Sequence, residues 1–220
     1  MDNLVKICGL STPETLDAAL SAGADMVGFV RFPKSPRHVS LNLGHRLSLQ
    51  AKGRAQRVVL LVNPGDEDIA QAVEAINPDL IQLHGSETPE RVAEIRSMVK
   101  RPVMKALGVA EPSDLQALTP YAGGADHLLL DAKPPRTAAA LPGGNGISFD
   151  WGLLKGLDPK VSFMLSGGLN PENVAEAIRL TKTQAVDVSS GVESRPGLKD
   201  PARIEAFIRA ARSAFAAAHH

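Results

Sequence analysis

"RVVLLVNPGDEDIAQAVEAINPDLIQLH", residues 57–84, contains one complete strand–helix–strand repeat. It begins with a continuous apolar run at 57–62, which is typical of a strand buried on both faces of a parallel sheet. Residues 65–76 carry apolar side chains at helical spacing, and a second apolar run occupies 80–84. Two strands joined by a helix in this way are the building unit of α/β proteins.

The same alternation extends outward over the whole chain. Apolar runs recur at 4–8, 26–30, 57–62, 80–84, 102–107, 126–131, 161–165 and 185–189, with helical patterns between them. Eight repeats within 220 residues predict an α/β fold, a (β/α)8 TIM barrel, which needs about 200 residues or more. An open doubly wound sheet is the alternative, but the G-x-G-x-x-G fingerprint is absent after the first run. Because no segment reads as a linker, we expect one domain over 1–220.

Composition excludes several function classes. Lys plus Arg and Asp plus Glu number 24 each, so the formal net charge is zero, and aromatic residues make up only 4%. Without a basic stripe, we expect no nucleic-acid partner. Without an apolar run near 18 residues, we expect no membrane span. The single cysteine cannot form an internal disulfide, which favours the cytoplasm, and the six histidines show no metal-ligand spacing. We expect a monomer without a metal ion.

Active sites of barrel enzymes lie at the C-terminal ends of the strands. Polar side chains stand at or near these positions in the eight predicted strands, although the strand interiors are apolar. They are Cys8, Arg31, Asn63, His84, Lys105, Asp131, Ser166 and Ser189. We therefore expect a polar, reactive site at this end of the barrel.

Two of these residues are candidates for acid–base chemistry. Cys8 is either a small buried apolar side chain or a base or nucleophile, and Lys6 nearby could lower the pKa of its thiol. Asp131 is either a carboxylate at the rim or a general acid. A carboxyl group facing a closed pocket could stay protonated and donate a proton near neutral pH.

The segment "LSGGLNPENV", 165–174, favours a phosphate site after the seventh strand. Gly167 and Gly168 would let the backbone approach the phosphate closely. We expect Asn170 to cap a helix that begins at Pro171, whose free N–H groups attract anions.

The segment "VDVSSGVE", 186–193, repeats this pattern after the eighth strand. Ser190 and Gly191 can open a short extra helix, and the loops after strands seven and eight are a frequent phosphate site in barrels. Asp187 is charged where an apolar residue is expected. It either pairs locally or accepts hydrogen bonds from sugar hydroxyl groups.

Two further loops are candidate parts of the site. Arg37, in the proline-braced segment 32–40, is either a surface charge or a clamp for a carboxylate. Residues 132–149 form a long loop rich in Pro and Gly, and loops of this length often act as lids.

Together these motifs resemble the phosphoribosylanthranilate isomerases of tryptophan biosynthesis, from about residue 4 to residue 200. The motifs, in the order seen in that family, are "VKICGL", "SPRHV", "IQLHG", "LLLD", "GGNGISFDW", "LSGGLNPENV" and "VDVSSGVE". One departure is Asn145, where the family usually has Thr, and it concerns a contact of the predicted lid.

The resemblance implies an Amadori rearrangement of N-(5-phosphoribosyl)anthranilate to 1-(2-carboxyphenylamino)-1-deoxyribulose 5-phosphate, without metal or cofactor. Asp131 would be the general acid and Cys8 the general base. Arg37 would hold the anthranilate carboxylate. The remaining matched positions are Gly167, Gly168, Ser190 and Gly191 for the phosphate, Asp187 for a sugar hydroxyl, and His84 near the site without a defined role.

Three alternatives remain open on the sequence. A Schiff-base aldolase would use Lys105 or Lys6 as its nucleophile. A related sugar-phosphate isomerase of histidine biosynthesis is expected to have an aspartate where Cys8 stands. The third alternative is a non-catalytic barrel that only binds a phosphate or a protein partner.

Overall fold

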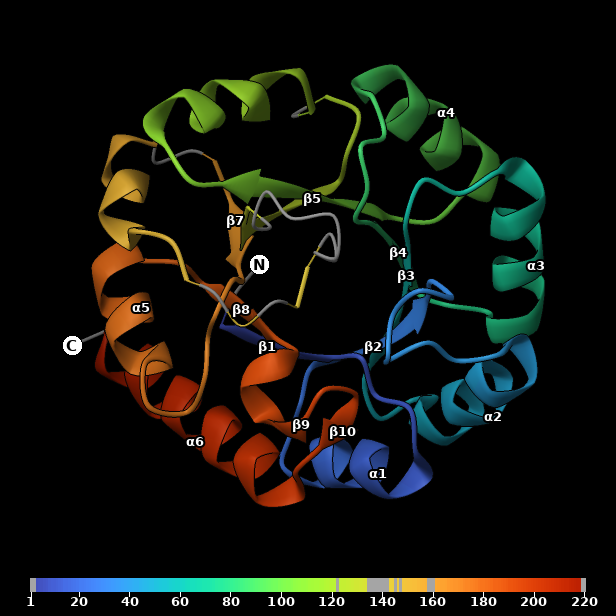
Figure 1. Ribbon diagram of the computed structural model, residues 1–220, viewed down its shortest axis with the longest axis horizontal. Coiled ribbons are helices and arrows are strands. Elements are labelled where there is room, and N and C mark those ends of the chain that lie inside the picture. Colours follow the sequence, from blue (N-terminus) through green and yellow to red (C-terminus); the bar gives the residue numbers. More distant parts are fainter. Residues whose placement is uncertain are drawn as a thin grey trace.

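The chain forms a closed barrel of eight parallel strands surrounded by helices (Figure 1). The computed structural model describes residues 3–121, 123–133, 143, 144, 146, 148–157 and 161–218. The strands follow each other around the barrel in chain order from β1 to β8. Pairing of β8 with β1, in which Lys6 lies opposite Asp187, closes the barrel. The predicted (β/α)8 fold is therefore confirmed.

The barrel strands are β1 Leu4–Cys8, β2 Met26–Arg31, β3 Gln56–Leu61, β4 Leu80–Leu83, β5 Val103–Val109, β6 His127–Ala132, β7 Phe163–Leu165 and β8 Ala185–Val188. The α-helices are α1 Pro13–Ser21, α2 Leu41–Ala51, α3 Asp66–Ile76, α4 Pro89–Val99, α5 Val174–Thr181 and α6 Pro201–Ala217. The remaining elements of the described residues are the 3₁₀ helices η1 Pro112–Tyr121, η2 Trp151–Gly156 and η3 Ser190–Val192, and a small antiparallel hairpin of β9 Glu193–Arg195 and β10 Leu198–Lys199.

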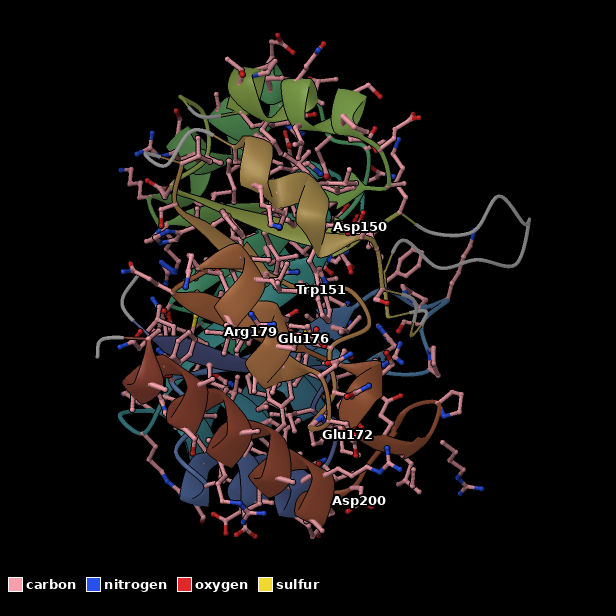
Figure 2. The ribbon with its side chains drawn as sticks, turned by 90° about the vertical axis from the view of Figure 1, so that its left-hand side faces the viewer. Asp150, Trp151, Glu172, Glu176, Arg179 and Asp200 are labelled. Atoms are coloured by element: carbon pink, nitrogen blue, oxygen red, sulfur yellow. The ribbon has the colours of Figure 1, made fainter. Side chains whose placement is uncertain are left out.

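Several helices begin where local chemistry predicts. Thr12, Thr88 and Asp200 each accept a hydrogen bond from the first turn of their helix, and a proline follows each of them. A proline at this position costs the helix no hydrogen bond, because an N–H group there would have no acceptor within the helix. Figure 2 shows η2, α5 and α6 side by side, with the capping residues Asp150 and Asp200 toward one end of the barrel. This is the end where the strands finish.

The segments after β5 and β6 form the 3₁₀ helices η1 and η2, and one local expectation, the start of α5, was wrong. In η1, Pro120 lacks the N–H that an α-helix interior needs. Helix α5 begins at Val174 and not at Pro171. Asn170 caps the turn before this helix instead, because its Oδ1 accepts hydrogen bonds from the N–H groups of Glu172 and Asn173.

Alternation along the strands separates two apolar regions. Side chains such as Val5 and Ile7 of β1 pack outward in the main core, which includes residues of the surrounding helices such as Phe207 of α6. Intervening residues of the strands fill the barrel from inside. They are Met26, Val58, Leu80, Met104, Ala106, Leu129, Met164 and Ala185. Successive side chains of a strand point to opposite faces, so every second residue of a strand faces the barrel interior and the others face the helices.

Replacing Phe207 with Ala should reduce the free energy of unfolding by about 3–5 kcal/mol, because the side chain is fully buried in the main core. Urea unfolding followed by circular dichroism measures the change. Leu49→Ala in α2 is the control; Leu49 is 57% exposed, and its loss should change stability by less than about 0.5 kcal/mol. Equal effects of the two substitutions would contradict the assignment of Phe207 to the core.

Candidate active site

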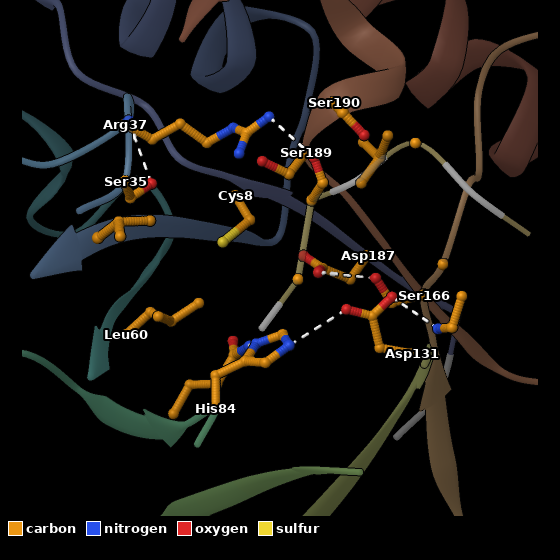
Figure 3. A pocket seen from close by; sticks show the side chains of 18 of the residues that line it. Cys8, Ser35, Arg37, Leu60, His84, Asp131, Ser166, Asp187, Ser189 and Ser190 are labelled. Carbon is orange, nitrogen blue, oxygen red and sulfur yellow. Dashed lines mark hydrogen bonds and ion pairs between the residues drawn. The ribbon is translucent and has the colours of Figure 1, made fainter. Parts of the chain in front are cut away.

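A pocket opens at the C-terminal end of the barrel (Figure 3). Its wall includes eight of the nine site residues predicted from the sequence, namely Cys8, Arg37, His84, Asp131, Gly167, Gly168, Asp187 and Ser190. The ninth, Gly191, lies beside the pocket. In Figure 3, Arg37 and Ser190 lie above Cys8, and His84 and Asp131 lie below it.

The predicted row of strand-end residues divides into two groups. Five members line the pocket: Cys8, His84, Asp131, Ser166 and Ser189. The other three, Arg31, Asn63 and Lys105, do not. Lys105 directly follows Met104, which points into the barrel, so its own side chain points outward. The expectation that the whole row forms one site was therefore wrong for these three.

The contacts of Lys105 argue against a Schiff-base mechanism. Its Nζ donates hydrogen bonds to Glu87 Oε2 at 2.7 Å and to the carbonyl oxygen of Gly85 at 2.7 Å. Burial lowers the pKa of Lys105, while the charge of Glu87 opposes this change. The amine is held outside the pocket, so a substrate there cannot reach it.

Lys6, the other aldolase candidate, is held inside the barrel by an ion pair. Its Nζ lies 2.8 Å from Asp187 Oδ1, and Ser166 Oγ donates to Asp187 Oδ2 at 3.3 Å. Burial lowers the pKa of Lys6, but the charges of Asp187 and Cys8 outweigh this effect and leave the pKa raised. Of the two roles considered for Asp187, local pairing is the one that these contacts display.

Cys8 lies at the end of β1, buried against Gly28 of β2 and on the wall of the pocket. Burial raises the pKa of its thiol, and the charge of Lys6 lowers it by a smaller amount. Asp187 adds to the increase. The expectation that Lys6 would lower the pKa of this thiol was therefore wrong in its net result, because desolvation penalises the thiolate more than Lys6 stabilises it.

The Asp131 carboxyl group is fixed from two sides. Its Oδ1 accepts a hydrogen bond from the N–H of Ala132 at 2.8 Å, and its Oδ2 lies 3.1 Å from His84 Nε2. Gln82 Nε2 lies 3.0 Å from His84 Nδ1. When Gln82 donates a hydrogen bond to Nδ1, the ring proton of neutral His84 lies on Nε2, which then donates a hydrogen bond to Asp131. This contact gives His84 a place in the site that the sequence did not define.

Arg37 is buried rather than a surface charge. Its Nε and Nη2 donate to the two oxygens of Glu193 at 2.7 and 2.8 Å, and Nη2 also donates to the carbonyl oxygen of Gly144 at 3.2 Å. Lys199 Nζ donates to Glu193 Oε1 at 2.7 Å. The sequence analysis predicted neither Glu193 nor Lys199 as part of the site. Glu193 ends the motif at 186–193 and could have been noticed there, whereas Lys199 gave no signal.

Two glycines allow close approaches in the loops after β7 and β8. A Cβ atom on Gly167, whose φ is +86°, would lie 2.5 Å from the backbone nitrogen of Ala132. A Cβ atom on Gly191 would lie 1.8 Å from the carbonyl oxygen of Leu169. Gly191 therefore lets the two loops pack together, and its predicted contact with phosphate stays a prediction.

The long loop at 132–149 is described only in part. Residues 134–142, Asn145 and residue 147 lie outside the described residues, so the lid and the effect of Asn145 stay predictions. Lys133, Gly143, Gly144 and Gly146 of this loop line the pocket. In the described part of the chain, no three His, Cys, Asp or Glu side chains are grouped to hold a metal ion. None of the described helices has the length and hydropathy to cross a membrane.

A pocket with titratable groups at the C-terminal mouth of such a barrel defines a (β/α)8-barrel enzyme. The model of the N-(5'phosphoribosyl)anthranilate (PRA) isomerase family matches residues 5–210. The chain belongs to this family. It is an isomerase, and its reaction is a step of tryptophan biosynthesis.

Relatives and solved structures agree with this assignment. An N-(5'-phosphoribosyl)anthranilate isomerase of Azorhizobium caulinodans is 60% identical over 97% of this chain and 93% of its own length. The phosphoribosyl anthranilate isomerase structure from Thermotoga maritima has a TM-score of 0.86 at 39% identity, over 97% of this chain and 100% of that one. A further structure, in complex with reduced 1-(o-carboxyphenylamino)-1-deoxyribulose 5-phosphate, has a TM-score of 0.83 at 36% identity, with the same coverage.

Because burial raises the pKa of Cys8, its thiol should react with iodoacetamide only at higher pH than an ordinary cysteine. The measurement is the alkylation rate against pH, with a cysteine-containing peptide as the reference. Cys8 is the sole cysteine of the chain, so mass spectrometry reports it without ambiguity, and Cys8→Ala gives the blank. A midpoint at or below that of the peptide would show that Lys6 outweighs burial.

Proposed function

We propose that Asp131 and Cys8 are the general acid and the general base of the Amadori rearrangement of N-(5'-phosphoribosyl)anthranilate. The observation that carries this proposal is that both side chains line the same pocket, from the ends of β6 and β1, which two other strands separate in the barrel. This arrangement suits an acid and a base that act on opposite parts of one substrate. The isomerisation moves one hydrogen and opens one ring, so it needs an acid and a base and no change in net oxidation state. Correctly placed acid–base groups of this kind typically contribute about 10²–10⁴-fold each.

In the first step, Asp131 donates a proton to the ring oxygen of the furanose. The bond between this oxygen and C1′ breaks, and the lone pair of the anthranilate nitrogen forms a protonated imine with C1′. The hydrogen bond from the N–H of Ala132 and the contact with His84 Nε2 hold the carboxyl group of Asp131 in one orientation for this transfer. A fixed donor avoids the entropic cost of orienting the acid at the moment of reaction.

In the second step, Cys8 removes the proton from C2′. The cationic imine next to C2′ withdraws electrons, which makes this proton acidic. The electron pair of the broken C–H bond forms a C1′–C2′ double bond and neutralises the imine nitrogen. The resulting enolamine then tautomerises to the ketone. Lys6 beneath Cys8 favours the thiolate that this step requires.

Binding groups lie around this acid–base pair. Arg37 would hold the anthranilate carboxylate, and the loops with Gly167, Gly168 and Ser190 would hold the phosphate. In support, the backbone N–H groups of Gly167 and Gly168 donate to no residue that the structure describes. The related structure noted above contains a ligand with both a carboxyphenyl group and a 5-phosphate. Asp187 is proposed to contact a sugar hydroxyl group at the centre of the pocket.

The remaining expectations belong to the same proposal. We infer that residues 1–220 form one domain and that the protein works as a monomer in the cytoplasm. The closed barrel supports a single domain, and the lone cysteine agrees with a reducing compartment.

The alternatives are weaker on specific grounds. A histidine-pathway isomerase is expected to have an aspartate in place of Cys8, and the family match names a different substrate. A non-catalytic barrel would not need a buried thiol and a fixed carboxyl group in one pocket. A Schiff-base enzyme would need a lysine that can reach the substrate, whereas Lys105 and Lys6 are both held in ion pairs.

Cys8→Ala and Asp131→Asn should each lower kcat/KM by about 10²–10⁴-fold, because each removes one proton transfer. The substrate is generated in situ, and loss of its anthranilate-type fluorescence gives the rate. Leu49→Ala, remote from the pocket, should keep the wild-type rate.

Other outcomes would identify the error. Full activity of Cys8→Ala would keep the reaction but exclude Cys8 as the base. Absence of conversion by folded wild type would contradict the proposed reaction, and the histidine-pathway ribotide would be assayed next. A covalent adduct after borohydride treatment with substrate would indicate a Schiff-base mechanism.

A further inference from the structure

Three buried charges lie beside the pocket and form what we call the charge triad: Arg37, Glu193 and Lys199. Their side chains are 6%, 4% and 1% exposed. Glu193 is the centre, since one of its oxygens accepts hydrogen bonds from both Arg37 Nε and Lys199 Nζ at 2.7 Å. The catalytic steps proposed above use Arg37 for binding and leave the two other charges unexplained.

The hairpin of β9 and β10 is built around this triad. Glu193 and Lys199 lie opposite each other in the ladder of the two strands. The N–H of Gly197, in the hairpin's turn, donates to Glu193 Oε2 at 3.2 Å. Lys199 Nζ is held further by the carbonyl oxygen of Ser189 at 2.8 Å and by its hydroxyl group at 3.1 Å. The ammonium group of Lys199 is therefore fixed behind Glu193.

The geometry leaves one edge of Arg37 for a ligand. The carboxylate of Glu193 accepts one hydrogen bond from Nε and one from Nη2, and the carbonyl oxygen of Gly144 accepts a second hydrogen bond from Nη2. Nη1 donates to no residue that the structure describes, and Arg37 lines the pocket. Two-point pairing of a guanidinium with a carboxylate fixes its plane, so Glu193 determines where Nη1 points.

The sum of charges explains why a third member is needed. Arg37 and Glu193 alone form a neutral pair, and a neutral pair attracts a carboxylate weakly. Lys199 makes the net charge of the triad +1, which leaves one positive charge for an anion at Arg37. A bound carboxylate would complete a row of alternating charges, Lys199, Glu193, Arg37 and ligand. Such charges interact strongly because water is largely excluded from them.

We propose that Lys199, acting through Glu193 and Arg37, sets the affinity of the pocket for the carboxylate of its substrate. Lys199 is a positioning residue that touches no substrate, and Glu193 orients the guanidinium. This inference rests on the proposed function, because it takes the ligand at Arg37 to be the anthranilate carboxylate.

A dependence on pH follows from the burial of Lys199. Burial lowers the pKa of Lys199 to about 8, the charge of Glu193 opposes this change, and Arg37 adds to the lowering. Cys8, as a thiolate, raises the pKa of Lys199. Lys199 is charged below its pKa and neutral above it, so the triad loses its surplus charge as pH rises through about 8. Affinity for a carboxylate should fall over this range.

The test measures binding rather than turnover. The probe is the reduced form of 1-(o-carboxyphenylamino)-1-deoxyribulose 5-phosphate, and its counterpart without the carboxylate is the control ligand. Isothermal titration calorimetry at pH 7 compares wild type with Lys199→Met and Lys199→Arg. We expect Lys199→Met to weaken the carboxylate ligand at least tenfold while leaving the control ligand within twofold. Lys199→Arg should restore most of the affinity.

The wild-type protein provides a second arm that needs no variant. Its Kd for the carboxylate ligand should rise at least threefold between pH 7 and pH 9, and its Kd for the control ligand should change in parallel with phosphate ionisation only. In Lys199→Arg the selective rise should disappear, because arginine keeps its charge over this range. In steady-state kinetics, KM should show the same dependence on pH. The pH dependence of kcat should instead reflect the ionisation of Cys8 and Asp131, the proposed base and acid.

The outcomes separate the inference from the proposed function. Equal weakening of both ligands by Lys199→Met, or a flat wild-type difference between the ligands across pH, would overturn the role of Lys199. If wild type binds the carboxylate ligand no more tightly than the control ligand, the assignment of Arg37 to the carboxylate fails instead, and the inference fails with it. If Lys199→Met does not fold, the wild-type pH series decides.

Discussion

The alternation of side chains along the barrel strands is the constraint on which the rest of this structure depends. Closing eight parallel strands forces each residue either into the barrel or toward the helices. Lys6 and Cys8 share the inner face of β1. Val5, which precedes Lys6, and Ile7, which lies between the two, belong to the outer core. The same rule brings Asp131 to the pocket and turns Lys105 away from it. The alternation of side chains along each strand thus decides which of them a substrate in the pocket can reach.

Buried charges lie inside the barrel and beside the pocket. Lys6 pairs with Asp187 under the pocket, and the charge triad lies at its side. Buried charges are costly unless each has a partner, and the structure supplies one in every case here. The pairs fix the inner groups in place, and they create the local fields that act on the Cys8 thiol. Burial nevertheless has the largest effect on this thiol and leaves its pKa raised.

The hairpin of β9 and β10 lies outside the barrel strands but contributes side chains next to the pocket. The hairpin of β9 and β10 follows β8 and contributes Glu193, which accepts hydrogen bonds from Arg37 in the loop after β2, and Lys199, which donates to Glu193. Segments far apart in the chain thereby converge on one guanidinium. Asp131 and Cys8, in contrast, sit on strands of the barrel itself, where their positions are fixed by the sheet. Positions on rigid strands suit groups that transfer protons, and loops suit groups that select a ligand.

The sequence by itself determined the barrel, because apolar runs and helical patterns are local and repeat eight times. It also determined most of the pocket wall, because the motifs around Cys8, Arg37, Asp131 and Gly167 lie at strand ends or in the loops that follow them. Only the tertiary structure decided which strand-end residues enter the pocket, since the closure of the sheet sets the face of each side chain. It alone revealed the charge triad around Arg37 and the net pKa direction of Cys8. A lysine 162 positions along the chain from Arg37 joins it through Glu193, and such long-range contacts and the depth of burial are properties of packing that no local pattern encodes.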